Sequence, residues 1–190
     1  MTADLFDRDA RRLARQRALR VADPFLLQAA FGDLLDRLAA IERPQRDILL
    51  VGAIDPTWSA RLAAGGATVT VAEPAESEDE DRTGFPRTHF DAVVACGTLD
   101  TVNDLPRALG ALAASLRPDS PLLGVLIGGN SFPRLRRSLL TADGPAASPR
   151  AHPRIEPSSL GTLLANAGLA MPVIDVERSA INYASLDRLV

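Results

Sequence analysis

The sequence predicts an α/β fold in which a mainly parallel sheet is covered by helices on both faces. Two observations lead there: short apolar runs alternate with helical segments, and Gly, Pro or acidic residues mark the boundaries between them. The chain has 190 residues, of which 46% are hydrophobic and 24% charged, so it can bury a core as one ordinary globular domain. Within this single domain we expect a helical N-terminal extension over residues 1–42 and the sheet over residues 43–190.

Composition excludes several classes of protein. All 21 basic residues are arginine and 24 residues are acidic, so the net charge of −3 argues against a general nucleic-acid binder. The single cysteine, Cys96, cannot form an internal disulfide. No apolar run approaches the roughly 20 residues of a membrane span, and no apolar signal segment begins the chain. Because nothing here requires an oxidising compartment, we expect a cytoplasmic protein. The two histidines and Cys96 lack zinc-ligand spacing, so we expect no metal site.

The N-terminal segment Asp7–Ala22 is rich in alanine and arginine and is predicted to be a solvated helix appended to the core. Its arginines recur four residues apart, as in Arg8 with Arg12 and Arg11 with Arg15, and crowd one side of the helix. They make this helix a candidate surface for a protein partner.

A second helix is expected to follow Asp23 and Pro24, with the aspartate as cap and the proline in the first helical position. Apolar residues then recur at three- and four-residue spacing between Leu27 and Ile41, and Pro44 ends the helix. This segment should lie on an apolar surface.

Four apolar runs are predicted as neighbouring parallel strands. They are Ile48–Ile54, Ala67–Ala72, Phe90–Ala95 and Leu122–Ile127. Right-handed crossovers should place them in the spatial order second, first, third, fourth. Because ligands of such sheets bind beyond the carboxyl ends of the strands, the loops after the first three runs are the expected location of a site.

The remaining segments complete the expected layers. Helices are predicted near residues 57–64, 105–116 and 131–140, and a last helix is capped by Ser158 or Ser159. The acidic tract at residues 76–81 should be a solvated loop. Two further strands are expected at Val173–Val176 and Ala180–Tyr183.

Several segments resemble class I S-adenosylmethionine-dependent methyltransferases, in particular the family of a mitochondrial complex I assembly factor and its alphaproteobacterial relatives. More distantly, the chain is similar to the malonyl-carrier-protein methyltransferase of biotin synthesis. The matching segments span essentially the whole chain: Leu5-Phe6-Asp7-Arg8, Phe90-Asp91-Ala92-Val93-Val94, Val102-Asn103-Asp104-Leu105-Pro106, Leu116-Arg117-Pro118-Asp119, Gly128-Gly129-Asn130, Ser148-Pro149-Arg150, Ala167-Gly168-Leu169 and Pro172-Val173-Ile174-Asp175. The resemblance implies a three-layer α/β/α Rossmann-like methyltransferase fold that binds S-adenosylmethionine and methylates a small-molecule or carrier-bound acceptor.

The resemblance also assigns the cofactor loop. In the family, an acid precedes a G-x-G-x-G turn; here the acid aligns with Leu50, and the second and third glycines align with Ile54 and Pro56. Only Gly52 remains, so we expect an eroded loop.

Three residues are candidates to bind the cofactor. Besides Gly52, Glu73 holds the position of the family's ribose-binding acid, and Cys96 lies near the end of a strand that faces the cleft. Alternatively, Glu73 is a solvated acid at a strand end and Cys96 is inert packing.

Two parts of the fold are expected to be shortened. Between Glu73 and Phe90 there are sixteen residues, too few for the helix and edge strand that close over adenine in the family. The family also continues beyond the position of Tyr183, so the missing C-terminal strand is either absent or supplied by a partner.

On the acceptor side, Asp100 is the candidate catalytic residue, as a base or as the group that orients a substrate amine or guanidinium; alternatively it is a solvated loop acid. Arg150 and Arg154 are candidates to bind a substrate carboxylate or phosphate, or else belong to a surface loop pinned by prolines.

Two other functions stay open. One is a non-catalytic assembly or scaffold protein that binds a partner through the N-terminal helix and the Arg134, Arg136, Arg137 cluster. The other is an arginine-modifying protein like the complex I assembly factor.

Overall fold

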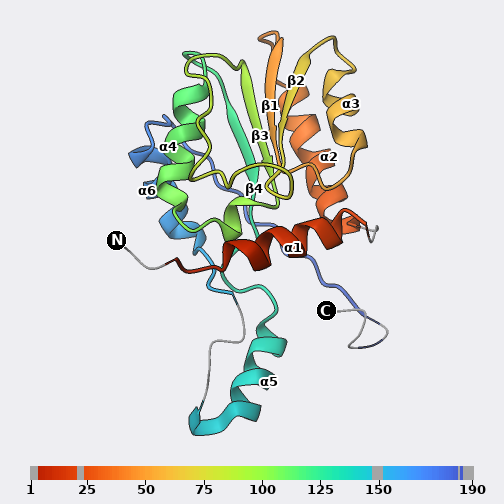
Figure 1. Ribbon diagram of the computed structural model, residues 1–190, viewed down its shortest axis with the longest axis vertical. Coiled ribbons are helices and arrows are strands. Elements are labelled where there is room, and N and C mark those ends of the chain that lie inside the picture. Colours follow the sequence, from red (N-terminus) through yellow and green to blue (C-terminus); the bar gives the residue numbers. More distant parts are fainter. Residues whose placement is uncertain (1–3, 21–23, 147–151, 184, 186–190) are drawn as a thin grey trace.

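The computed structural model describes residues 4–20, 24–146, 152–183 and 185. Its centre is a parallel sheet with the strand order β2-β1-β3-β4, which confirms the predicted order (Figure 1). The strands are β1 (Asp47–Val51), β2 (Thr68–Ala72), β3 (Ala92–Cys96) and β4 (Leu122–Val125). In the register, Leu50 of β1 pairs with Val71 of β2 and with Val94 of β3.

Helices form the outer layers of the fold (Figure 1). They are α1 (Arg8–Ala18), α2 (Phe25–Ala39), α3 (Thr57–Ala63), α4 (Leu105–Ser115), α5 (Pro133–Asp143) and α6 (Pro157–Asn166), with short 3-10 turns η1 (Leu99–Thr101) and η2 (Gly144–Ala146). Because side chains alternate along a strand, β1 buries Leu49 and Val51 toward α4 and α6, and Ile48 and Leu50 toward α2 and α3. The three-layer arrangement is therefore confirmed.

The amphipathic helix α2 belongs to the core. Its Phe31 is fully buried and stacks on Trp58 of α3, with ring centroids 4.3 Å apart and planes 5° from parallel. Pro24 is the cap residue of α2 rather than its first helical residue, so that detail of the prediction is wrong. Asp23, the expected cap, lies outside the described residues.

Helix α1 lies across the carboxyl ends of the strands, at the lower end of the sheet in Figure 1. Asp7 caps it, and its side chain accepts a hydrogen bond from Ala10 N. The expectation of a fully solvated helix is wrong, because Arg11 is only 7% exposed. Helix α5, by contrast, has no buried residue and projects away from the sheet (Figure 1).

Two expectations for the C-terminal part are also wrong. Residues 172–183 contain no strand, and Val173 and Val176 are 82% and 59% exposed. β-Branched residues form a strand only where a neighbouring strand supplies hydrogen bonds and packing. The last helix begins at Pro157 after Glu156, ahead of both predicted serine caps, because proline fits the first helical position.

Candidate functional site

The turn after β1 brings the backbone of two strands unusually close together. Gly52 has a φ of +79°, and a Cβ there would lie 2.6 Å from the carbonyl oxygen of Cys96 and would overlap the methyl group of Thr98. Only glycine fits this combination of left-handed backbone and close approach. The strand therefore ends at Val51, earlier than the predicted Ile54.

Glu73 follows β2 directly and faces this turn. One carboxylate oxygen accepts hydrogen bonds from Arg15 Nε at 2.5 Å and Ala75 N at 3.1 Å. The other accepts from Arg15 Nη2 at 2.7 Å and Ala53 N at 2.8 Å. Burial alone would raise the pKa of Glu73, but Arg15 and the two backbone N–H groups outweigh it and lower the pKa. Glu73, 5% exposed, is thus neither solvated nor free to accept further hydrogen bonds.

Arg15 joins the ends of three strands. Besides Glu73 after β2, its Nη1 donates to the carbonyl oxygen of Gly97 after β3 at 2.9 Å. Its Nη2 lies 3.4 Å from the point that a Cβ would occupy at Gly52, which follows β1. A single guanidinium from α1 therefore occupies the space above the turn in which the resemblance places the cofactor.

The acidic tract after Glu73 binds the other inward-facing arginines of α1. Arg8 donates to both carboxylate oxygens of Asp81 at 2.8 Å, and Arg11 binds Glu80 at 3.0 Å and contacts Asp79. Glu80 and Asp81 are 1% and 4% exposed, so the prediction of a solvated loop is wrong for these two residues. Paired arginines allow these carboxylates to be buried as charged groups.

Cys96 points away from this site. Its thiol lies among the residues that pack against α2, 3.9 Å from the carbonyl oxygen of Leu27. Burial raises the pKa of the Cys96 thiol to about 12. The thiol is therefore an unreactive packing group in this environment.

A cavity of about 220 Å³ lies beside η1 and brings two predicted site residues together. Asp100 and Arg154 both line it, while most of the wall is apolar. Burial raises the pKa of Asp100, so this carboxyl group is not a solvated loop acid. Arg150, the other candidate from the same loop, lies outside the described residues.

One wall of this cavity connects two segments that are far apart in the sequence. Phe6 N donates to the Asn103 side-chain oxygen at 2.7 Å, and the Asn103 amide donates back to Phe6 O at 3.0 Å. The Phe6 ring also packs against His152, with centroids 5.3 Å apart. These contacts fix the chain before α1 against the loop that begins α4.

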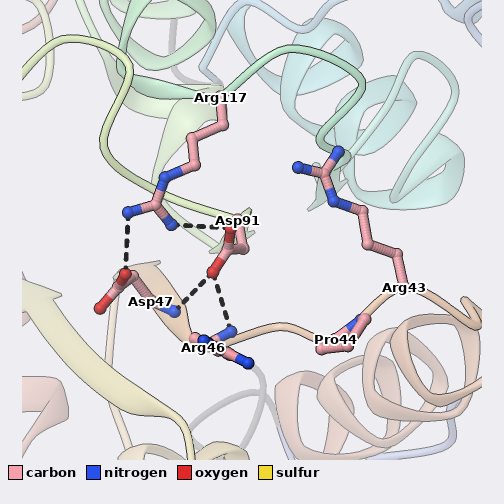
Figure 2. A pocket seen from close by; sticks show the side chains of 6 residues that line it. All are labelled: Arg43, Pro44, Arg46, Asp47, Asp91 and Arg117. Carbon is pink, nitrogen blue, oxygen red and sulfur yellow. Dashed lines mark hydrogen bonds and ion pairs between the residues drawn. The ribbon is translucent and has the colours of Figure 1, made fainter.

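Another cavity, of about 410 Å³, lies at the opposite end of the sheet, and Figure 2 shows the side chains that line it. Arg117 donates to Asp91 at 2.7 Å and to Asp47 at 3.0 Å, and Asp91 accepts backbone N–H groups of Arg46 and Asp47. Burial would raise the pKa of Asp91, but these donors lower it overall. The cluster ties the amino ends of β1 and β3 together and has the character of a structural clamp.

The arginines of α1 and the acids of the tract were not predicted from sequence to be parts of one site. The available signal was the opposite charge of two segments, with Arg8, Arg11 and Arg15 on one helix face at three- and four-residue spacing. Within the described ranges, no group of three or more His, Cys, Asp or Glu residues is placed to hold a metal ion. Across those same ranges, every helix is too short or too polar to cross a membrane.

Comparison with known proteins gives a family and several relatives. Residues 14–172 match the family described as "Methyltransferase domain". The human protein named "Arginine-hydroxylase NDUFAF5, mitochondrial" is 29% identical over 213 residues, which cover all of this chain and 62% of that protein. The rat protein of the same name is 36% identical over 115 residues, covering 59% of this chain and 34% of that protein. The chain thus spans about one third to three fifths of the lengths of these relatives.

Among solved structures, the chain is similar to the Burkholderia thailandensis 1,6-didemethyltoxoflavin-N1-methyltransferase, determined with its toxoflavin precursor and S-adenosylhomocysteine bound. The TM-score is 0.52 at 19% identity, and the match covers 74% of this chain and 66% of that one. This similarity supports the fold.

Proposed function

Since this chain belongs to the methyltransferase domain family, we propose that it is a member whose S-adenosylmethionine site is filled by its own helix α1. In this proposal it acts as a non-catalytic assembly or scaffold protein. The observation that carries the proposal is the Arg15–Glu73 pair. All four hydrogen bonds accepted by the carboxylate come from the chain itself, so ribose hydroxyls find no free acceptor there.

The residues of the expected cofactor loop support this proposal. Leu50, at the position of the family's loop-organising acid, is fully buried and packs toward α2. Ile54 packs against the same cluster, and Pro56 caps α3. None of these three side chains offers a hydrogen bond to a ligand, so they cannot replace the contacts of the family's loop-organising acid.

The proposal is tested by calorimetric titration of S-adenosylmethionine into the purified protein. We expect no binding heat at millimolar cofactor for the unmodified protein. The Arg12→Ala variant is the matched control for any variant of a buried arginine of α1, because Arg12 is exposed and, among the described residues, its ion pair is with Asp9. Micromolar binding by the unmodified protein would contradict the proposal.

A second candidate function is methyl transfer to a small-molecule or carrier-bound acceptor once α1 has moved away. Gly52 and Glu73 keep the positions that the resemblance assigns to them, and the Burkholderia neighbour was determined with S-adenosylhomocysteine bound. The arginines hold α1 over the strand ends through ion pairs and hydrogen bonds, which a ligand can replace. Micromolar cofactor binding by Arg15→Gln, absent from the unmodified protein, would support this candidate.

The arginine-modifying alternative rests on another feature. The acids around Glu73 already hold arginine side chains, and the human and rat relatives carry the name arginine-hydroxylase. In this alternative, an arginine of a partner protein replaces Arg15 at the site.

For the scaffold role, the exposed arginines of α5 and Arg12 of α1 provide the partner surface, because Arg8, Arg11 and Arg15 are bound internally. A cytoplasmic location stays a prediction.

A further inference from the structure

We propose that the cavity beside η1 binds a free aliphatic α-amino acid, with its ammonium group on Asp100 and its carboxylate on Arg154. This inference goes beyond the proposed function, because the cavity has no lining residue in common with the Arg15–Glu73 contact. Failure to bind S-adenosylmethionine therefore leaves it untouched, and its own failure leaves the role of α1 untouched.

Two residues that line the cavity each have a buried polar atom without a hydrogen-bond partner. Within the part of the chain that the structure describes, Asp100 Oδ1 and Arg154 Nε are buried and have no hydrogen-bond partner. A buried polar atom without a partner costs free energy, so such atoms mark places where a ligand can supply the missing bond. The two atoms, one an acceptor and the other a donor, belong to residues that line the same cavity, and they point to a ligand with a polar head group.

The two residues bring opposite charges to the cavity. Asp100 is an acid and Arg154 a permanent cation, and no ion pair of 4.0 Å or less joins them among the described residues. A ligand with a cation and an anion close together satisfies both, since charge-assisted hydrogen bonds are stronger than neutral ones. The ammonium and carboxylate groups of an α-amino acid have this arrangement. The Arg154 guanidinium also lies over the Phe132 ring, 5.5 Å from its centroid, but this contact brings no anion. A simple amine therefore leaves Arg154 without an anionic partner, and a simple carboxylate leaves Asp100 without a cationic one.

The rest of the cavity wall determines which kind of side chain the ligand has. It is built largely from apolar side chains: Leu5, Leu99, Val102, Leu105, Ile155 and Leu163. Asn103, another polar residue of the lining, is already engaged with the backbone of Phe6. An aliphatic side chain therefore has the complementary surface, and a charged or strongly polar side chain does not.

Several segments of the chain enclose the cavity. The cavity is bounded by the chain before α1, by η1 and the start of α4, by the loop before α6, and by α6 itself. The reciprocal Phe6–Asn103 hydrogen bonds hold the first two of these segments together. A volume of about 220 Å³ suits a ligand of the size of a single amino acid.

The test uses L-leucine as the probe, titrated calorimetrically into the full chain. Two matched compounds share its aliphatic body: 3-methylbutylamine lacks the carboxylate, and 4-methylpentanoate lacks the ammonium group. We expect L-leucine to bind at least about tenfold more tightly than either compound, because each removes one charge-assisted contact. Equal affinity for all three, or no binding of L-leucine at millimolar concentration, would overturn the proposal.

Variants locate the two contacts. Asp100→Asn should weaken leucine and 3-methylbutylamine by about tenfold or more and leave 4-methylpentanoate unaffected. Arg154→Gln should weaken leucine and 4-methylpentanoate by about tenfold or more and leave 3-methylbutylamine unaffected. Arg107→Gln is the matched control, because Arg107 is exposed on α4 and does not line the cavity. Thermal unfolding verifies that each variant is folded, and leucine binding that is unchanged in both folded site variants would refute the assignment.

Discussion

Arg15 and Glu73, 58 residues apart in the sequence, form a two-pronged ion pair with N–O distances of 2.5 and 2.7 Å. The pair places a helix from the N-terminal part of the chain directly on the strand end that the family resemblance assigns to ribose. A fork-shaped guanidinium and a carboxylate are well matched in geometry, so this contact is specific as well as strong. The same contact explains how α1 is held at the ends of the strands.

The pairing of Arg11 with Glu80 predicts a large loss of stability on truncation. The two side chains are 5% and 2% exposed, so Arg11→Ala leaves an uncompensated buried carboxylate. We expect the free energy of unfolding to fall by about 3–5 kcal/mol, as for other buried pairs that lose one partner. Urea denaturation followed by circular dichroism measures the change.

The control for this prediction is another arginine of the same helix. Arg12→Ala removes an exposed pair with Asp9 and should cost less than about 1 kcal/mol. Similar losses in the two variants would show that α1 is held by its helical backbone and not by its buried arginines.

Glu73 predicts that the docking of α1 weakens in acid. Its pKa in the folded protein is lower than usual, so the ion pair with Arg15 contributes stability above the ordinary glutamate pKa. That contribution is lost as the pH falls from the ordinary pKa through the lower folded pKa. Hydrogen exchange of the α1 amides measured across this range should show protection decreasing first in α1.

In the Glu73→Gln variant this acid dependence should be smaller, because the substituted side chain does not titrate. Asp81, whose pKa Arg8 also lowers, still titrates in that variant and accounts for a remaining part. If the unmodified protein and the variant lose protection in the same way, Glu73 does not control the docking of α1.

Gly52 and Gly66 separate two effects of a methyl group. Both have positive φ, +79° and +86°, so alanine strains the backbone at either position by about 1–2 kcal/mol. At Gly66 the added Cβ meets open space, whereas at Gly52 it meets the carbonyl oxygen of Cys96 at 2.6 Å. Gly52→Ala should therefore be more destabilising than Gly66→Ala by about a further 1–3 kcal/mol. Equal effects on the urea midpoint would mean that β3 moves away without cost.

The order of the strands could be predicted from sequence because it depends on local signals. Buried runs such as Ile48–Val51 alternate with helices, and right-handed crossovers then leave few topologies. Gly52 and Glu73 could also be placed near each other, since parallel strands end at the same edge of a sheet. These features follow from periodicity and chain connectivity alone.

The α1 contacts could not be predicted in the same way. An arginine-rich helix and an acidic loop each have the composition of solvated segments, and Arg11 and Glu80 become buried only because each supplies the other's charge. The expected strand at Val173–Val176 failed for a related reason, since its β-branched residues needed a neighbouring strand. Pairing between distant segments is a tertiary property that composition does not reveal.

Asp100 predicts a gain of stability on neutralisation. Burial raises the pKa of its carboxyl group, so the folded protein is most stable with Asp100 protonated and loses that stability as the pH rises through the raised pKa. At neutral pH, Asp100→Asn removes this buried charge while keeping nearly the same shape. The free energy of unfolding is expected to increase by about 1 kcal/mol, which corresponds to a melting temperature higher by about 2–4 °C.

This stability advantage of Asp100→Asn should shrink in acid, where the aspartate of the unmodified protein is already protonated. Differential scanning calorimetry at several pH values measures both effects, with Asp104→Asn as an exposed comparison that removes the same charge and keeps a side-chain oxygen to cap α4. A lower melting temperature for Asp100→Asn at neutral pH would mean that Asp100 is stabilised as a charged group by the arginines around it, and that the buried carboxylate is not a cost to the fold.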